Sequence, residues 1–265
     1  MRPSCLIFGI IGIVYKMIDV LVFLVGLALG SFLNAVVWRL ENKKPVGLAR
    51  SECPLCHHKL NFWDLWPVFS FLKLWGRCRY CRKKISWQYP LVEIACGLGL
   101  VFIFNKSVGI WESVFISGIF LLWVLIFVYD FKYLIIPDRF VVVGLVWVSA
   151  SIFFLNTGNV FSKLFTAIGL FLFFFSMYFF SKGTWVGGGD VKLGFLIGWW
   201  LGWPLTLLAL LFSYITGAMV GLALLIFKKA GLKTQIPFGP FLVLSSMAAY
   251  FYGFQIINWY VQLLS

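Results

Sequence analysis

The sequence predicts an all-α, polytopic membrane protein with about eight transmembrane helices and one small polar loop domain on the cytoplasmic side. Hydrophobic residues make up 62% of the 265 positions and charged residues only 12%, and a soluble protein of this length could not cover so much apolar surface. The apolar residues also gather into long runs, and a helix needs about 20 such residues to cross a bilayer. The alternating pattern of a membrane β-barrel is not seen.

Eight apolar segments are candidates for spanning helices. They comprise residues 20–37, 89–104, 113–129, 140–155, 164–180, 191–203, 205–227 and 238–264. The second and the sixth are short, so each could instead be a re-entrant segment. We keep the sixth as a span, because without it the basic segment FKKAGLK would lie outside the cytoplasm.

The basic residues predict how these segments are oriented. Eleven of the 22 lysines and arginines lie between residues 39 and 84, together with three acids. Short basic loops stay on the cytoplasmic side, so this loop is cytoplasmic and, with eight spans, both termini lie outside the cytoplasm. The net charge of +13 belongs mainly to loops that flank the membrane. We therefore expect membrane lipid with anionic headgroups, and not nucleic acid, as its partner.

Residues 1–16 leave three interpretations open. They could form a brief signal-like segment, although no A-x-A-like cleavage site follows the apolar run. They could lengthen the first helix. The natural start could also be Met17.

Four cysteines in the long loop are spaced like the ligands of a metal ion. Cys53 and Cys56 are separated by two residues, as are Cys78 and Cys81, and 21 residues lie between the pairs. Two C-x2-C turns can direct four thiolates at one centre, which is the donor set of structural zinc sites. Disulfides are the alternative, but the cytoplasm is reducing. The loop therefore predicts a zinc-binding domain without an open coordination position, whose ligands do not include the adjacent histidines.

Two aspartates are expected at one end of the helical bundle. Asp130 ends the third span and Asp190 begins the sixth. Two complete spans separate them, so both return to the same membrane face. Two carboxylates that share a site cannot both ionise easily, so one can hold a proton while the other accepts one. Such a pair can activate water and polarise a carbonyl group, as peptide-bond hydrolysis requires.

The alternative reading of both aspartates is local. Asp190 could be a helix N-cap and Asp130 a solvated acid, although Asp130 lies at the unfavourable end of the helix dipole. Asp138 follows Pro137 at the start of the fourth span, where capping of the helix explains it. The glycines 187–189 are expected to take positive φ and to let the backbone approach a partner closely. Supporting residues of the site are predicted to be Gly187, Gly189, Asp138 and Lys192.

At these residues the sequence resembles the bacterial type IV prepilin peptidases, membrane aspartyl proteases with a G-x-G-D motif. The resemblance rests on six motifs in order, which are GSFLNAVVWRL (30–40), CPLC with CRYC, ISWQYPLVE (85–93), DFKYLIIPD (130–138), GGGDVKL (187–193) and IPFGPFL (236–242). It covers nearly the whole chain from Met17 onward. It identifies Asp130 and Asp190 as the two catalytic aspartates.

The resemblance also implies an activity and a location. The enzyme would cleave the leader from type IV prepilins or pseudopilins at the cytoplasmic face of the bacterial inner membrane. Many members also N-methylate the new amino terminus with S-adenosylmethionine as cosubstrate. No G-x-G-x-x-G motif follows a strand, so the residues that bind this cosubstrate stay unknown. The identity of the substrate and the oligomeric state are not indicated.

Two other classes of function compete with the peptidase. A proton- or cation-coupled transporter also uses membrane carboxylates, but its site usually lies near the midplane between inverted repeats, and no internal repeat is seen. A scaffold of pilus assembly would leave the aspartates unexplained. The predicted division of the chain is a first helix with its N-terminal segment (1–38), the cysteine loop domain (39–88) and the aspartyl peptidase bundle (89–265).

Overall fold

The computed structural model describes residues 3–45, 51–227 and 235–264, with side chains from residue 16 onward. The chain divides into two compact units, Met1–Ser117 and Gly118–Ser265. Within the described ranges all regular structure is helical, and the fold class is confirmed. The three-part division at residues 38 and 88 is a different kind of division, by function, and stays a prediction.

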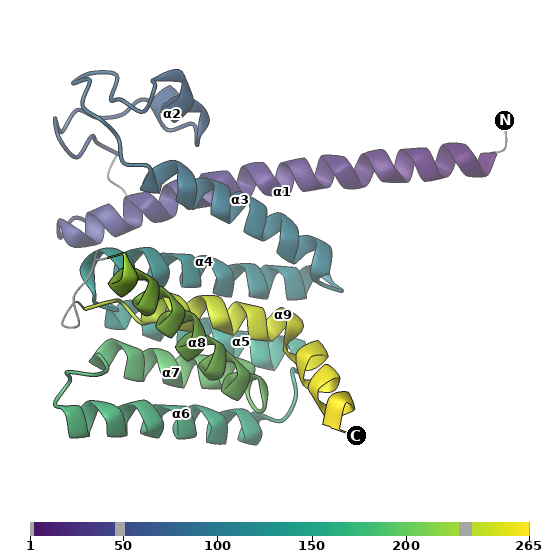
Figure 1. Ribbon diagram of the computed structural model, residues 1–265. Coiled ribbons are helices and arrows are strands. Elements are labelled where there is room, and N and C mark those ends of the chain that lie inside the picture. Colours follow the sequence, from purple (N-terminus) through teal and green to yellow (C-terminus); the bar gives the residue numbers. More distant parts are fainter. Residues whose placement is uncertain (1–2, 46–50, 228–234, 265) are drawn as a thin grey trace. The chain divides into compact units, whose positions relative to one another are not determined.

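The described helices follow one another along the chain, and those between residues 88 and 226 are joined by short connections (Figure 1). They are α1 (Pro3–Glu41), the 3-10 helix η1 (Phe62–Asp64), α2 (Phe69–Lys73), α3 (Gln88–Lys106), α4 (Ile110–Tyr133), α5 (Asp138–Leu155), α6 (Val160–Ser181), α7 (Gly188–Leu201), α8 (Leu205–Ile226) and α9 (Gly239–Leu264). Each of the eight predicted apolar segments falls, apart from one or two residues at its ends, on a helix of its own. The first helix continues back to Pro3, in agreement with the reading that residues 1–16 lengthen it.

Seven of the described helices are long and apolar enough to cross a membrane. Of the eight predicted spans, the one that does not qualify is α7, the predicted sixth span, which has 14 residues. At 1.5 Å per residue it is about 21 Å long, whereas the hydrocarbon core is about 30 Å thick. The sixth span was therefore correctly predicted to be helical and correctly suspected of being short.

In the first unit, α1 packs closely against α3. Two glycines four residues apart, Gly26 and Gly30, face the backbone of α3. A Cβ added to Gly26 would lie 2.6 Å from the Cα of Gly97, and one added to Gly30 would lie 2.7 Å from the Cα of Glu93. Such contacts are too short for any side chain, so the two glycines let the helix backbones touch, as small residues at this spacing do in membranes.

In the second unit, α7 is the central helix and contacts α5, α6, α8 and α9. Its contact with α6 repeats the glycine spacing of α1. A Cβ on Gly194 would lie 2.5 Å from the ring of Phe174, and one on Gly198 would lie 2.7 Å from the Cα of Ala167. Because neighbours surround it, most residues of α7 are buried. Its first turn, which carries Asp190, is held within the bundle.

Candidate active site

The two predicted aspartates lie in the second unit, and both are buried. Asp130 is in the last turn of α4 and is 5% exposed, and Asp190 is in the first turn of α7 and is 9% exposed. They lie close enough to interact electrostatically. Two carboxylates 60 positions apart in the chain are therefore both buried in the second unit, and their catalytic role stays a prediction.

Main-chain groups hold both carboxylates. The N–H of Gly187 donates a hydrogen bond of 3.2 Å to Oδ2 of Asp190. The N–H of Gly239, the first residue of α9, interacts with the carboxylate of Asp130. Oδ2 of Asp130 is buried and has no hydrogen-bond partner among the described residues. A buried acceptor without a partner is costly, so this oxygen is suited to receive a proton, a water or a substrate group.

Ile136, in the connection between α4 and α5, packs against the glycines on both sides of the pair. A Cβ on Gly189 would lie 3.0 Å from the Cβ of Ile136, and one on Gly239 would lie 3.3 Å from its Cδ1. The predicted close approach at Gly189 is therefore present. The predicted positive φ is not, because none of the glycines 187–189 is among the residues with positive φ, and φ of Gly187 is −74°. Gly189 is therefore required for space and not for an unusual backbone conformation, whereas a Cβ on Gly187 or Gly188 would meet its neighbours at ordinary contact distances.

Asp138 and Lys192 form an ion pair that joins the start of α5 to α7. The predicted capping role of Asp138 is wrong. The N-cap of α5 is Pro137 and no side chain caps it, since Asp138 is already the first helical residue. The carboxylate of Asp138 instead points to the neighbouring helix. Its side chain is 72% exposed, so it does not join the buried pair.

Sequence reasoning did not single out three further residues near the pair, Gly239, Ile136 and Tyr214. Tyr214 of α8 lies within electrostatic range of Asp190, and its hydroxyl donates to Sδ of Met177 at 3.4 Å. Its ring lies 5.1 Å from that of Phe238, directly before Gly239. The motif IPFGPFL contains both Phe238 and Gly239, so the sequence held a signal for them but none for Tyr214.

The four cysteines of the first unit meet at one point. The sulfurs of Cys53, Cys56, Cys78 and Cys81 all lie within 4.8 Å of one another. Four thiolates at this separation suit one tetrahedral ion, with metal–sulfur distances of about 2.3 Å for zinc. Neither neighbouring histidine belongs to the cluster: His57 contacts Glu52, and the ring of His58 lies 3.7 Å from that of Tyr80. The donor set therefore fits a structural zinc ion.

Each of the two cysteine pairs lies in a turn, and the two turns have the same conformation. In the first turn, the N–H of His57 bonds to the carbonyl of Cys53 at 2.9 Å; in the second, the N–H of Arg82 bonds to the carbonyl of Cys78 at 3.0 Å. His57 and Arg82, each directly after the second cysteine, have φ of 54° and 57°. This left-handed residue turns the chain back after each pair, so that both sulfurs point to one side.

The environment of Cys53 favours its thiolate. Burial opposes ionisation, but the N–H groups of Leu55 and Cys56 and the thiols of Cys56 and Cys78 bond to its sulfur and lower the pKa of Cys53 to about 7. Metals bind the thiolate and not the thiol, so Cys53 is the ligand that ionises more readily, whereas the pKa of Cys56 and that of Cys78 are raised.

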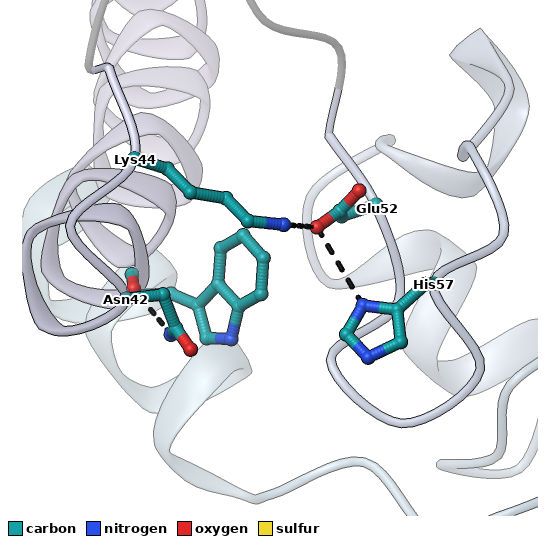
Figure 2. Close-up of polar contacts among 5 residues, drawn as sticks. Asn42, Lys44, Glu52 and His57 are labelled. Atoms are coloured by element: carbon teal, nitrogen blue, oxygen red, sulfur yellow. Dashed lines mark hydrogen bonds and ion pairs between the residues drawn. The ribbon is translucent and has the colours of Figure 1, made fainter.

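Two polar contacts fasten the cysteine domain to the membrane helices of its unit. Lys44, just after α1, pairs with Glu52, whose other contact is Nδ1 of His57 at 3.7 Å (Figure 2). Glu93 of α3 accepts the N–H of Val68 at 2.7 Å. Glu93 is buried and connects the loop to α3.

Comparison with known proteins shows to which family this chain belongs. The bacterial peptidase A24 N-terminal domain matches residues 24–107, and the type IV leader peptidase family matches residues 116–222. A Legionella pneumophila protein named prepilin leader peptidase/N-methyltransferase is 34% identical, over 90% of this chain and 92% of its own length. The chain belongs to the type IV leader peptidase family.

Other members of the leader peptidase family extend the comparison. Proteins with the same name from Bacillus subtilis and Pseudomonas aeruginosa are 32% and 30% identical, over 92% and 90% of this chain and 98% and 92% of their own lengths. The two matched domains contain the four cysteines and both aspartates, respectively. No solved structure matches this leader peptidase significantly. Nothing in the comparisons supports the transporter alternative.

Proposed function

We propose that this protein removes the leader peptide of prepilins or pseudopilins and methylates the new amino terminus, as the names of its relatives state. The observation that carries the proteolytic half is the buried pair of Asp130 and Asp190. Its proposed place is the bacterial inner membrane, with the aspartates at the cytoplasmic face, where the leader would end just before the hydrophobic helix of the prepilin.

The proposed chemistry is hydrolysis without a covalent intermediate. Two nearby carboxylates in a dry site share one proton, because two negative charges there would repel each other strongly. The ionised aspartate takes a proton from a water molecule, whose oxygen attacks the scissile carbonyl carbon. The protonated aspartate donates to the carbonyl oxygen. The C–N bond then breaks: the leaving amine takes a proton from the aspartate that had received one, and the other aspartate takes a proton back from a hydroxyl of the tetrahedral intermediate, which becomes the new carboxylic acid.

The experiment that tests this proposal measures leader removal from a purified prepilin by mass spectrometry. We expect Asp130→Asn and Asp190→Asn each to abolish cleavage, because an asparagine cannot exchange a proton at working pH. Membrane insertion and thermal unfolding should be close to those of the wild type. Near-normal cleavage by either variant would exclude this catalytic pair.

We also propose that Cys53, Cys56, Cys78 and Cys81 hold one structural zinc ion. The closeness of the four sulfurs supports this assignment. The ion would stabilise a loop that has little apolar core of its own. Elemental analysis of protein prepared without chelators should find about one zinc per chain, and Cys78→Ser should lose it. Protein without bound metal would contradict the assignment.

S-adenosylmethionine is the proposed methyl donor, and we assign none of the described residues to its binding. The functional division into residues 1–38, 39–88 and 89–265 belongs to the same proposal, with metal binding in the second part and hydrolysis in the third. Mass measurement of the product with and without S-adenosylmethionine separates the activities. A cleaved product that gains no methyl group in its presence would limit this protein to proteolysis.

A further inference from the structure

A cluster of exposed aromatic side chains lies in residues 62–75 of the cysteine domain. Successive rings touch one another: Phe62 and Trp63 have centroids 5.9 Å apart, Trp63 and Trp66 5.5 Å, and Trp66 and Phe69 5.7 Å. Trp63 is 64% exposed and Phe69 is 58% exposed. Contiguous apolar surface of this kind marks a binding surface more often than an ordinary solvated face. We call residues 62–75 the aromatic segment.

Contacts with α3 fix the position of the aromatic segment along the axis of that helix. The N–H of Val68 bonds to Oε2 of Glu93, the sixth residue of α3, at 2.7 Å. The ring of Phe71 lies 5.0 Å from that of Trp87, directly before α3. Figure 1 shows α2 beside the start of α3. Because α3 is a candidate membrane span, the aromatic segment lies level with the first turns of a helix that enters the bilayer.

The backbone conformation of Val68 indicates that the surrounding structure holds the aromatic segment in this position. Val68 has φ of 57°, which a β-branched residue rarely adopts. Such a conformation persists only where the surrounding structure requires it. The hydrogen bond to buried Glu93 supplies that requirement, and Ser31 of α1 bonds to the same carboxylate. The segment is therefore attached to both membrane helices of its unit.

The charges around the segment have one sign. Residues 65–92 contain six lysines and arginines and no acid. Lys73 lies within the segment and Arg77 lies two residues after it, and both are exposed. The one acid of the segment, Asp64, is held by Arg79 at 2.9 Å and accepts from the hydroxyl of Tyr80 at 3.2 Å. Positive charge beside indole and phenyl rings at the height of a membrane surface complements acidic phospholipid headgroups.

We propose that the aromatic segment is an interfacial anchor that rests on the leaflet beside α3 and binds acidic phospholipids. Its rings enter the headgroup region, and Lys73 and Arg77 contact the phosphates. The domain that holds the cysteines is thus attached to the lipid surface as well as to α1 and α3. A protein partner is the competing occupant, and the test separates the two.

The test uses the full chain in liposomes of phosphatidylcholine and phosphatidylglycerol. An environment-sensitive fluorescent amino acid replaces Trp66, and in a matched control it replaces Lys59, an exposed residue of the first cysteine turn. Nitroxide lipids labelled near the headgroup should quench the probe at position 66 and leave the one at position 59 unchanged. Aqueous iodide should quench the two in the reverse order.

Two results would overturn the proposal. Iodide quenching at position 66 as strong as at position 59 would mean that the segment is in water. Protection from iodide without quenching by lipid would mean that a protein covers it.

The charges are tested by Lys73→Glu combined with Arg77→Glu, which should reduce lipid quenching at position 66. Equal quenching with and without these substitutions, or in pure phosphatidylcholine, would overturn the role of acidic headgroups. Unchanged thermal unfolding shows that the variants fold.

Discussion

At the scale of single residues, the aspartate pair depends on a position where no side chain fits. A Cβ on Gly239 would lie 2.5 Å from Oδ2 of Asp130, closer than such atoms approach. The glycine therefore lets the first turn of α9 place its N–H against the carboxylate. Helix N-termini stabilise negative charge. Gly239 therefore fixes the position of Asp130 and also favours the ionised form of its carboxylate.

We predict that Gly239→Ala lowers leader cleavage strongly, because the new methyl group must push Asp130 away from Asp190. A displacement of about 1 Å can reduce a rate by roughly a hundredfold. The matched control is Gly217→Ala in α8, where a Cβ would meet the ring of Phe241 at an ordinary 3.6 Å. Rates of prepilin cleavage should separate the two variants. Equal rates would show that the contact at Gly239 has no catalytic consequence.

A second prediction concerns the ion pair of Asp138 and Lys192. Both side chains are largely exposed, and exposed pairs contribute about 0–1 kcal/mol. Asp138→Asn and Lys192→Gln should therefore retain most of the cleavage rate and change the unfolding temperature little. A loss by Asp138→Asn as complete as that of Asp190→Asn would mean that a third carboxylate takes part in the chemistry.

At the scale of residues, the sequence predicts a functional residue well when the signal lies in the residue itself and its neighbours in the chain. Asp130 and Asp190 are acids in apolar surroundings, and counting spans was enough to bring them to one face. Gly239 and Glu93 act on residues far away in the chain, Asp130 and Val68, so their partners became visible only in the folded structure. The capping role of Asp138 failed for the opposite reason: the local rule was sound, but a lysine on α7 takes the carboxylate.

At the scale of helices, glycines spaced four apart determine which helices touch. Gly26 and Gly30 place α1 against α3, and Gly194 and Gly198 place α7 against α6. Lipid tails are as apolar as leucine, so close backbone packing is a main source of helix association in membranes. The sequence shows both spacings, but it does not show which helix each pair of glycines faces.

We predict that Gly198→Leu lowers both stability and cleavage, because the side chain would collide with the backbone of α6 at Ala167 and shift α7. Overpacking of this kind typically costs about 1–3 kcal/mol. Gly169→Leu on α6 is the matched control, since a Cβ there has nothing within 4 Å. Thermal unfolding in detergent and cleavage rates check this. An equal effect of both substitutions would point to a general effect of leucine.

At the scale of the whole molecule, the metal site and the aspartate pair belong to different compact units. Composition and apolar runs predicted the helices well, because a membrane constrains length and polarity at once. The division between units at Ser117 was not predicted, because it depends on which helices pack and falls inside α4, a continuous apolar segment.

We predict that Cys53→Ser loosens the first unit and leaves the second intact. Hydrogen exchange should become faster in the main chain of residues 51–87, where the two cysteine turns lie, and stay unchanged in α7 and α9. The control is Lys59→Ala, an exposed change in the same turn. Faster exchange throughout the chain would show that the units unfold together, contrary to the expectation.

The burial of Asp190 at the start of α7 has a consequence for the substrate. The ring of Tyr178 lies beside both Gly183, just after the end of α6, and Gly188, the first residue of α7. Asp190 follows in the first turn of α7 and is only 9% exposed, so a peptide must enter the bundle to reach its carboxylate. A peptide that enters as a helix keeps its carbonyls occupied by its own hydrogen bonds. Cleavage therefore requires the substrate to unwind locally, and glycine beside the scissile bond should speed the reaction where alanine slows it.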